Sequence, residues 1–176
     1  MKILILGLGY VGTANAVLLS QHNEVICYDL NSNRIDQINK KISPIEDEEA
    51  SKFLLSSNLN IRGVTKFPSS EDFNFVVIAT PTNYDPKTNN FDTSSIQDCI
   101  GQLNNVGSKA TIIIRSTLPI GFVKSMKKKF PSQEIIFVPE LPCCFLQRYL
   151  LITILAHQQV VLSIGHTVYW LFHHHG

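Results

Sequence analysis

The sequence lacks a surplus of charge of either sign. It contains 15 Lys and Arg residues against 14 Asp and Glu residues in a chain of 176, which gives a formal net charge of +1. Proteins that hold nucleic acid or an anionic membrane surface through long-range attraction normally carry a basic excess. We therefore expect no nucleic acid partner and no membrane partner.

Cysteine is scarce, and its four positions show no metal-ligand spacing. Cys27 and Cys99 stand alone, while Cys143 and Cys144 are adjacent to each other. Zinc sites and disulfide frameworks require regularly spaced cysteines, so neither is predicted. A secretory leader is also not indicated, because Met1 is followed directly by a strand-like apolar run. These absences predict a cytoplasmic protein with reduced thiols.

Residues 1–140 alternate short apolar runs with helix-like segments. A chain of this length accommodates one full domain but is short for a nucleotide domain plus a substrate domain. The apolar runs read as strands that are buried on both faces, as in a parallel sheet covered by helices. The expected strands are 2–6, 24–29, 60–64, 75–80, 111–116 and 134–138, and the expected helices are 11–21, 32–41, 46–56, 94–103 and 121–130. This order predicts a doubly wound α/β domain of the Rossmann type over residues 1–140.

A glycine-rich motif follows the first expected strand. The stretch GLGYVG places Gly7, Gly9 and Gly12 at the spacing G-x-G-x-x-G, at the start of the first expected helix. The first glycine of this motif permits a tight turn, the second lets a pyrophosphate approach the backbone, and the third lets the helix pack on the strand. The helix N-terminus then offers N–H groups to the phosphates. The alternative interpretation is a tight turn that binds nothing.

An acidic residue closes the second expected strand. Asp29 lies about 20 residues beyond the glycine motif, where a carboxylate accepts hydrogen bonds from ribose hydroxyls. The same carboxylate repels a 2′-phosphate, so NAD is favoured over NADP. Arg34 keeps NADP as an alternative, although it also fits a solvated helix residue.

Two hydroxyl-rich loops follow later strands. ATPTNYD begins at Ala79 and RSTLPIG begins at Arg115, each at the end of an expected strand. Ligands of doubly wound sheets bind outside the carboxyl ends of the strands. Each loop alone also fits ordinary loop chemistry, but two such loops at one edge favour a site.

These motifs together resemble the nucleotide-domain half of the UDP-glucose/GDP-mannose dehydrogenase family. The shared stretches are GLGYVG, YDLNSNRIDQIN, SPIEDE, ATPTNYD, RSTLPIGF and IIFVPE, in the family's order and spacing over residues 1–140. SPIEDE with TPTNYD is more similar to the UDP-glucose branch than to the GDP-mannose branch. The resemblance implies an NAD-binding Rossmann domain from an enzyme that oxidises the C6 alcohol of UDP-glucose to a carboxylate in two hydride transfers.

The resemblance also implies roles for particular residues. Thr82 and Thr117 match threonines near the nicotinamide, and Thr117 matches one that orients a water or the substrate oxygen. Glu140 matches a glutamate that acts in thioester hydrolysis. The residues implied to bind the cofactor are Gly7, Gly9, Tyr10, Val11, Gly12, Asp29, Arg34, Thr82 and Thr117, and those implied to be catalytic are Thr117 and Glu140.

The sequence departs from the family after Glu140. The family continues with Phe-Leu-Arg-Glu-Gly, whereas this chain continues with Leu-Pro-Cys-Cys. The central helix that supplies the family's homodimer contacts and the loop bearing its nucleophilic cysteine are not matched, and Cys143 and Cys144 lack that loop's flanking motif. We therefore expect a chain that binds NAD and does not catalyse by itself.

Residues 141–176 form an atypical apolar tail. Arg148 is their one Lys, Arg, Asp or Glu, and they hold five of the six histidines. The simplest expectation is a frameshift or truncation product near codon 140. A membrane span over 149–172 is the alternative, although His157 and His166 interrupt it at a cost in hydrocarbon. Other open interpretations are a dehydrogenase of the GDP-mannose or UDP-N-acetylmannosamine type and a non-catalytic NAD-binding module.

Overall fold

The protein is described by a computed structural model that covers residues 1–56, 58–86 and 90–139. Residues 1–139 form one compact unit. Glu140 and the tail, including the alternative membrane span over 149–172, lie outside the described residues. Within the described ranges, no helix is both long enough and apolar enough to cross a bilayer.

Six strands form one parallel sheet in the order β3-β2-β1-β4-β7-β8. They are β1 (Lys2–Leu6), β2 (Glu24–Tyr28), β3 (Ile61–Val64), β4 (Phe75–Ile78), β7 (Thr111–Ile114) and β8 (Ile135–Phe137). The chain moves outward from β1 to β3 and then restarts beside β1 with β4. The α/β class and the parallel sheet are thereby confirmed, and the reversal between β1 and β4 creates the crevice in which doubly wound folds bind ligands.

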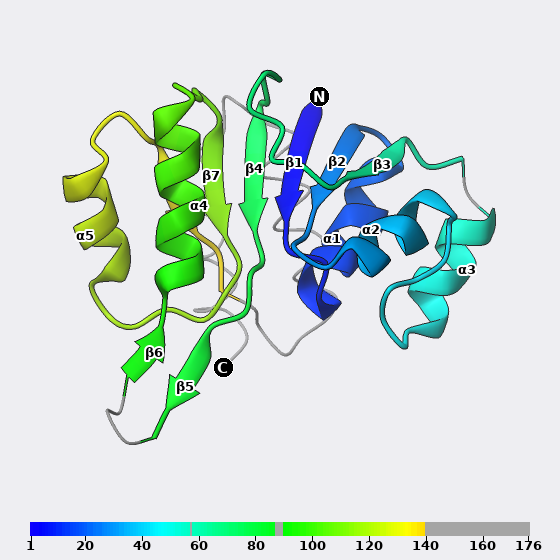
Figure 1. The fold of residues 1–176 in the computed structure, drawn as a ribbon, viewed down its shortest axis with the longest axis horizontal. Coiled ribbons are helices and arrows are strands. Elements are labelled where there is room, and N and C mark those ends of the chain that lie inside the picture. Colours follow the sequence, from blue (N-terminus) through cyan, green and yellow to red (C-terminus); the bar gives the residue numbers. More distant parts are fainter. Residues whose placement is uncertain (57, 87–89, 140–176) are drawn as a thin grey trace, which may run out of the picture. The chain divides into compact units, whose positions relative to one another are not determined.

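In the described part of the chain, five helices connect the strands at bounds close to those expected. They are α1 (Tyr10–Ser20), α2 (Ser32–Asn39), α3 (Glu48–Ser56), α4 (Ser94–Asn105) and α5 (Phe122–Lys129). In Figure 1, α1, α2 and α3 accompany the β1–β3 half of the sheet, while α4 and α5 accompany the β4–β8 half.

Alternation along the strands sends apolar side chains to both faces of the sheet. Leu4, Val76 and Ile112 belong to one buried cluster with Ile100 of α4 and Met126 of α5. Their strand neighbours, of which Ile3, Ile5, Val77 and Ile113 are fully buried, point to the opposite face because successive side chains alternate. Burial on both faces explains why these strands are continuous apolar runs.

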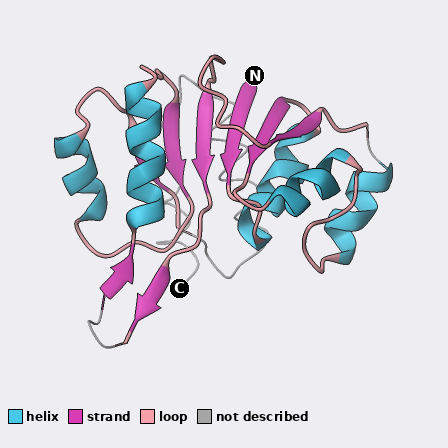
Figure 2. Cartoon of the chain, in the orientation of Figure 1, coloured by secondary structure: helices cyan, strands magenta, loops and turns pink. Residues whose placement is uncertain are grey.

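One element was not predicted. The loop after β4 contains a short antiparallel hairpin of β5 (Asn83–Asp85) and β6 (Asn90–Asp92), which pair with each other and not with the main sheet. Figures 1 and 2 show the hairpin beyond the carboxyl ends of β4 and β7. Its strands have the sequences NYD and NFD, and Asn and Asp are depleted in strands, so neither segment was recognised.

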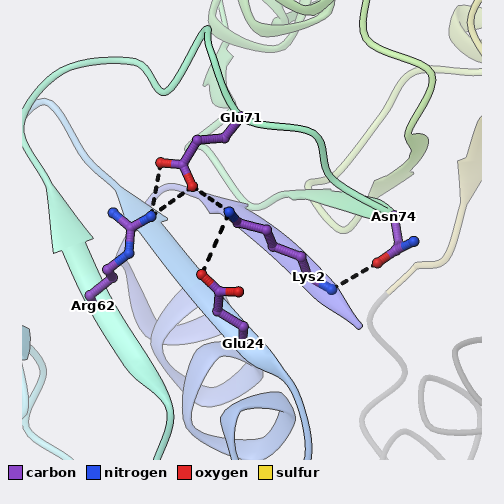
Figure 3. Close-up of polar contacts among 5 residues, drawn as sticks. All are labelled: Lys2, Glu24, Arg62, Glu71 and Asn74. Carbon is purple, nitrogen blue, oxygen red and sulfur yellow. Dashed lines mark hydrogen bonds and ion pairs between the residues drawn. The ribbon is translucent and has the colours of Figure 1, made fainter.

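A network of charged side chains ties the strands together at the opposite edge of the sheet (Figure 3). Glu71 accepts from Arg62 at 2.7 and 2.8 Å and lies 2.6 Å from Lys2 Nζ. Lys2 Nζ also lies 3.6 Å from Glu24 Oε1, and the Lys2 backbone N–H donates to Asn74 Oδ1 at 2.8 Å. The hydrogen bonds from Arg62 and then from Lys2 lower the pKa of Glu71.

Candidate functional site: a nucleotide crevice at the carboxyl edge

The glycine loop follows β1 and lies beside the chain that leaves β4. Gly7 follows β1 with a φ of 96°, in the left-handed region that favours glycine. A Cβ on Gly7 would lie 2.8 Å from the carbonyl oxygen of Ala79, so the loop after β4 packs directly on it. A Cβ on Gly12 would lie 1.7 Å from the Gly7 carbonyl oxygen. Both glycines are therefore required by the closeness of two backbones.

Gly9 has a different role from its two neighbours. It precedes α1 with an extended backbone, and a Cβ built on it would meet no atom within 4 Å. As a glycine, it has no side chain that could cap the helix by a hydrogen bond. The first N–H groups of α1 have no partner within the helix itself. The geometry fits a pyrophosphate that approaches the backbone at Gly9 and receives those N–H groups.

Tyr10 and Val11 begin α1 at this opening. The Tyr10 side chain is 64% exposed, and that of Val11 is partly buried. Thr13, one turn later, is buried, and its backbone N–H donates to the Gly9 carbonyl at 2.9 Å. The predicted pyrophosphate loop therefore presents the backbone of residues 7–12 and one exposed aromatic ring.

Asp29 is joined to the glycine loop. Its Oδ2 atom accepts from the Leu8 N–H at 2.6 Å, and its Oδ1 atom accepts from the Asn31 N–H at 2.8 Å. The side chain is 10% exposed, and Arg34 Nη1 lies 3.5 Å from Oδ2. Each carboxylate oxygen can accept two hydrogen bonds, so capacity for ribose hydroxyls remains. Arg34 is thus an ion-pair partner of Asp29 rather than a purely solvated residue, with 39% of its side chain exposed.

The loops after β4 and β7 are joined to each other. The buried Ser116 hydroxyl donates to the Thr80 carbonyl at 2.6 Å. Ser95, in the first turn of α4, places its Oγ atom 3.1 Å from Thr80 Oγ1 and 3.1 Å from the Pro81 carbonyl oxygen. Three elements that are distant in sequence therefore meet on the segment Thr80–Pro81, beside Gly7.

The predicted threonines lie at this same edge. Thr82 is partly buried and directly precedes β5, while Thr117 is exposed and lies three residues beyond β7. Glu140 lies outside the described residues, so its predicted role remains a prediction. Sequence reasoning did not single out the Leu8 N–H or Ser95. A backbone donor carries no residue signal, and Ser95 resembles an ordinary helix-start hydroxyl.

Comparison with known proteins agrees with this geometry. Residues 1–138 match the UDP-glucose/GDP-mannose dehydrogenase family, NAD binding domain. The UDP-glucose 6-dehydrogenases of Campylobacter jejuni and Streptococcus pneumoniae are each 43% identical to this chain over 80% of its length. The chain spans about 36% of the length of each of these relatives.

Solved structures give the same fold. UDP-D-ManNAc dehydrogenase from Pyrococcus horikoshii superposes with a TM-score of 0.70 at 25% identity, over 81% of this chain and 37% of that one. GDP-mannose dehydrogenase from Pseudomonas aeruginosa gives 0.68 at 25% identity, over 80% of this chain and 36% of that one. The chain therefore belongs to the UDP-glucose/GDP-mannose dehydrogenase family and contains its NAD-binding domain.

Proposed function

We propose that this chain is the NAD-binding part of a UDP-glucose 6-dehydrogenase, and that it binds NAD but does not turn over UDP-glucose alone. The observation that carries this proposal is the 43% identity to two relatives of that name across 80% of the chain. A GDP-mannose 6-dehydrogenase of Pseudomonas putida is 33% identical over a shorter span. The identity therefore favours UDP-glucose over GDP-mannose as the substrate of the whole enzyme.

The residues of the crevice suit the two ends of NAD. The backbone of Gly7–Gly12 would hold the pyrophosphate, and Asp29 with Arg34 would hold the adenosine ribose. Since β4 and β7 lie on the other side of β1 from β2, the nicotinamide half would extend toward Thr82 and Thr117. When bound, NAD would accept a hydride from the sugar C6 carbon.

Among the described residues, Thr117 is the one to which we assign a catalytic role. Its exposed hydroxyl follows β7 at the carboxyl edge, where it can orient a water or the substrate oxygen. We propose Glu140 as the base that activates water against a thioester, in keeping with the resemblance of IIFVPE to the family. A nucleophilic cysteine for that thioester would have to come from the part of the relatives that this chain does not match.

The length of the match supports the absence of turnover. Hydride transfer requires the sugar carbon to be held close to the cofactor, and a misplacement of about 1 Å costs roughly a hundredfold in rate. About 36% of each relative's length is matched here. We infer that the remaining part of such enzymes supplies most of the sugar site.

A chimera tests the proposal. Residues 1–139 of this chain would replace the corresponding residues of the Campylobacter jejuni relative, and NADH formation would be measured with UDP-glucose and with GDP-mannose. We expect turnover with UDP-glucose that falls at least about a hundredfold on Thr117→Ala, because one hydroxyl aimed at a developing charge contributes that much. The unmodified chain, assayed beside it, should bind NAD by calorimetry and form no NADH.

The outcomes separate the alternatives. A folded chimera that binds NAD without turnover would contradict the catalytic role and favour a non-catalytic NAD-binding module. NADH formation by the unmodified chain would contradict the proposed lack of turnover. A preference of the chimera for GDP-mannose would show that this domain selects the nucleotide sugar.

A further inference from the structure

The segment that leaves β4 packs directly against the glycine loop. The Ala79–Thr80 peptide lies so close to Gly7 that a Cβ there would be 2.8 Å from the Ala79 carbonyl oxygen and 3.1 Å from the Thr80 nitrogen. The last sheet contacts of this segment are the Ala79 N–H to Leu6 and the Arg115 N–H to Ile78, at 2.8 and 2.9 Å. Beyond them, the path of the chain depends on other contacts.

Those contacts come from two serine hydroxyls. Pro81 has no backbone N–H, so a conventional backbone ladder cannot continue at that position. Ser116 instead donates to the carbonyl of Thr80 at 2.6 Å, and Ser95 Oγ lies 3.1 Å from the Pro81 carbonyl oxygen. One serine comes from the loop after β7 and the other from the first turn of α4. Together they fix both carbonyls of the segment from two sides.

Ser95 also sets the state of the Thr80 hydroxyl, because a serine hydroxyl has one hydrogen to donate. When Ser95 donates to Pro81, the Thr80 hydroxyl can donate to Ser95 and keeps a lone pair to accept from a ligand. When Ser95 donates to Thr80 Oγ1, 3.1 Å away, the Thr80 hydrogen is free to be donated. The pair can therefore meet either a donor or an acceptor, and a carboxamide presents both.

We propose that Ser95 and Ser116 are positioning residues for the nicotinamide half of NAD. They act through Thr80 and Pro81, whose position determines where the next residue, Thr82, is placed. This inference rests on the NAD binding of the family and adds two residues to the predicted site. The contacts of Ser95 and Ser116 with Thr80 and Pro81 lie on the β4 side of β1, whereas Asp29 follows β2 on the other side. Loss of these contacts should therefore weaken binding of the nicotinamide end of NAD and leave binding of the adenosine end unchanged.

The test compares NAD with ADP-ribose, which lacks the nicotinamide. Both ligands would be titrated by calorimetry into the full chain and into Ser95→Ala and Ser116→Ala. We expect each variant to bind NAD about threefold to tenfold more weakly, as for the loss of one hydrogen bond that orients a binding segment. ADP-ribose affinity should stay within about twofold of wild type by the same reasoning.

Two further variants control for structural effects. Ser95→Thr keeps the hydroxyl and should restore NAD affinity to within about twofold. Ser132 precedes β8 at the opposite edge of the sheet, and its hydroxyl donates to Asn104 Oδ1 at 3.1 Å. Ser132→Ala removes this contact and should change the affinity for neither ligand. Thermal unfolding of every variant would be recorded, and Ser95→Ala carries the test if the buried Ser116→Ala fails to fold.

Equal losses for NAD and ADP-ribose, or no loss for either, would overturn the positioning role while leaving NAD binding intact. Failure of Ser95→Thr to restore NAD affinity would also overturn it. A wild-type chain that binds neither ligand would instead overturn NAD binding by this chain, and the inference with it.

Discussion

The Asp29 carboxylate accepts a hydrogen bond from the Leu8 N–H, with 2.6 Å between Oδ2 and the nitrogen. This bond joins the end of β2 to the glycine loop after β1, across 21 positions of sequence. The residue proposed to recognise the ribose therefore also sets the conformation of the loop proposed to hold the pyrophosphate. One hydrogen bond therefore joins the two parts of the proposed adenosine diphosphate site.

Replacing Asp29 with Ala should weaken NAD binding and reduce the preference for NAD over NADP. The lost hydrogen bonds to a charged group correspond to about 1.5 to 3 kcal/mol, since such bonds are stronger than neutral ones. Calorimetric titration of both cofactors measures the effect. Asp29→Asn serves as the matched variant, because it keeps an oxygen acceptor but removes the charge that opposes a 2′-phosphate. Wild-type affinity for NADP equal to that for NAD would contradict this assignment.

Gly9→Ala and Gly12→Ala should fail in different ways. At Gly12 the new Cβ would lie 1.7 Å from a backbone oxygen that cannot move freely, so we expect a loss of about 2 to 4 kcal/mol in unfolding free energy. At Gly9 the new Cβ meets nothing within 4 Å, so stability should change by less than about 0.5 kcal/mol. NAD affinity of Gly9→Ala should nevertheless fall at least about tenfold, because the methyl group stands where the pyrophosphate approaches.

Urea unfolding and NAD titration of the two glycine variants provide the measurements. A Gly9→Ala protein that binds NAD like wild type would show that the pyrophosphate does not approach the backbone there. A stable Gly12→Ala protein would contradict the close packing of α1 on the loop.

The charged network around Glu71 should make stability depend on acid pH. The pKa of Glu71 is lowered from its usual 4.5, chiefly by the Arg62 hydrogen bonds and then by Lys2. A lowered folded-state pKa stabilises the protein above the unfolded-state value, and this contribution is lost as pH falls through the folded-state value. Because the side chain is 24% exposed, we expect no more than about 1 kcal/mol in total.

Glu71→Gln is the variant that isolates this effect. It should be less stable than wild type at pH 7 and equally stable once Glu71 is protonated in the folded state. Urea midpoints across the acid range would show this convergence. A constant difference between the two proteins at all pH values would mean that packing, and not charge, underlies the effect.

The loss of charge after Glu140 predicts that residues 141–176 are not the family's own continuation. The family match ends at residue 138, and one charged residue occurs between 141 and 176. Translation of all three frames of the gene beyond codon 140 should reveal a continuation beginning Phe-Leu-Arg-Glu-Gly. A gene without such a frame would contradict the frameshift hypothesis.

The glycine spacing, the buried strands and the acidic residue after β2 were enough to predict a doubly wound NAD-binding domain. Each of these signals is local: an apolar run implies a strand buried on both faces, and G-x-G-x-x-G implies a turn close to another backbone. The short hairpin of β5 and β6 was missed because each strand consists of one aromatic residue between Asn and Asp, which are depleted in strands, whereas the equally short β8 is an apolar run.

The partners of the site residues depended on the tertiary structure. Ser116 reaches Thr80 across 36 positions, and Asp29 reaches a backbone N–H that no side chain marks. Such pairs exist only because β4 lies between β1 and β7 in parallel register, which brings loops from separate parts of the chain to one edge. Sequence determined which residues follow each strand, and the order of the strands in the sheet decided which of them meet.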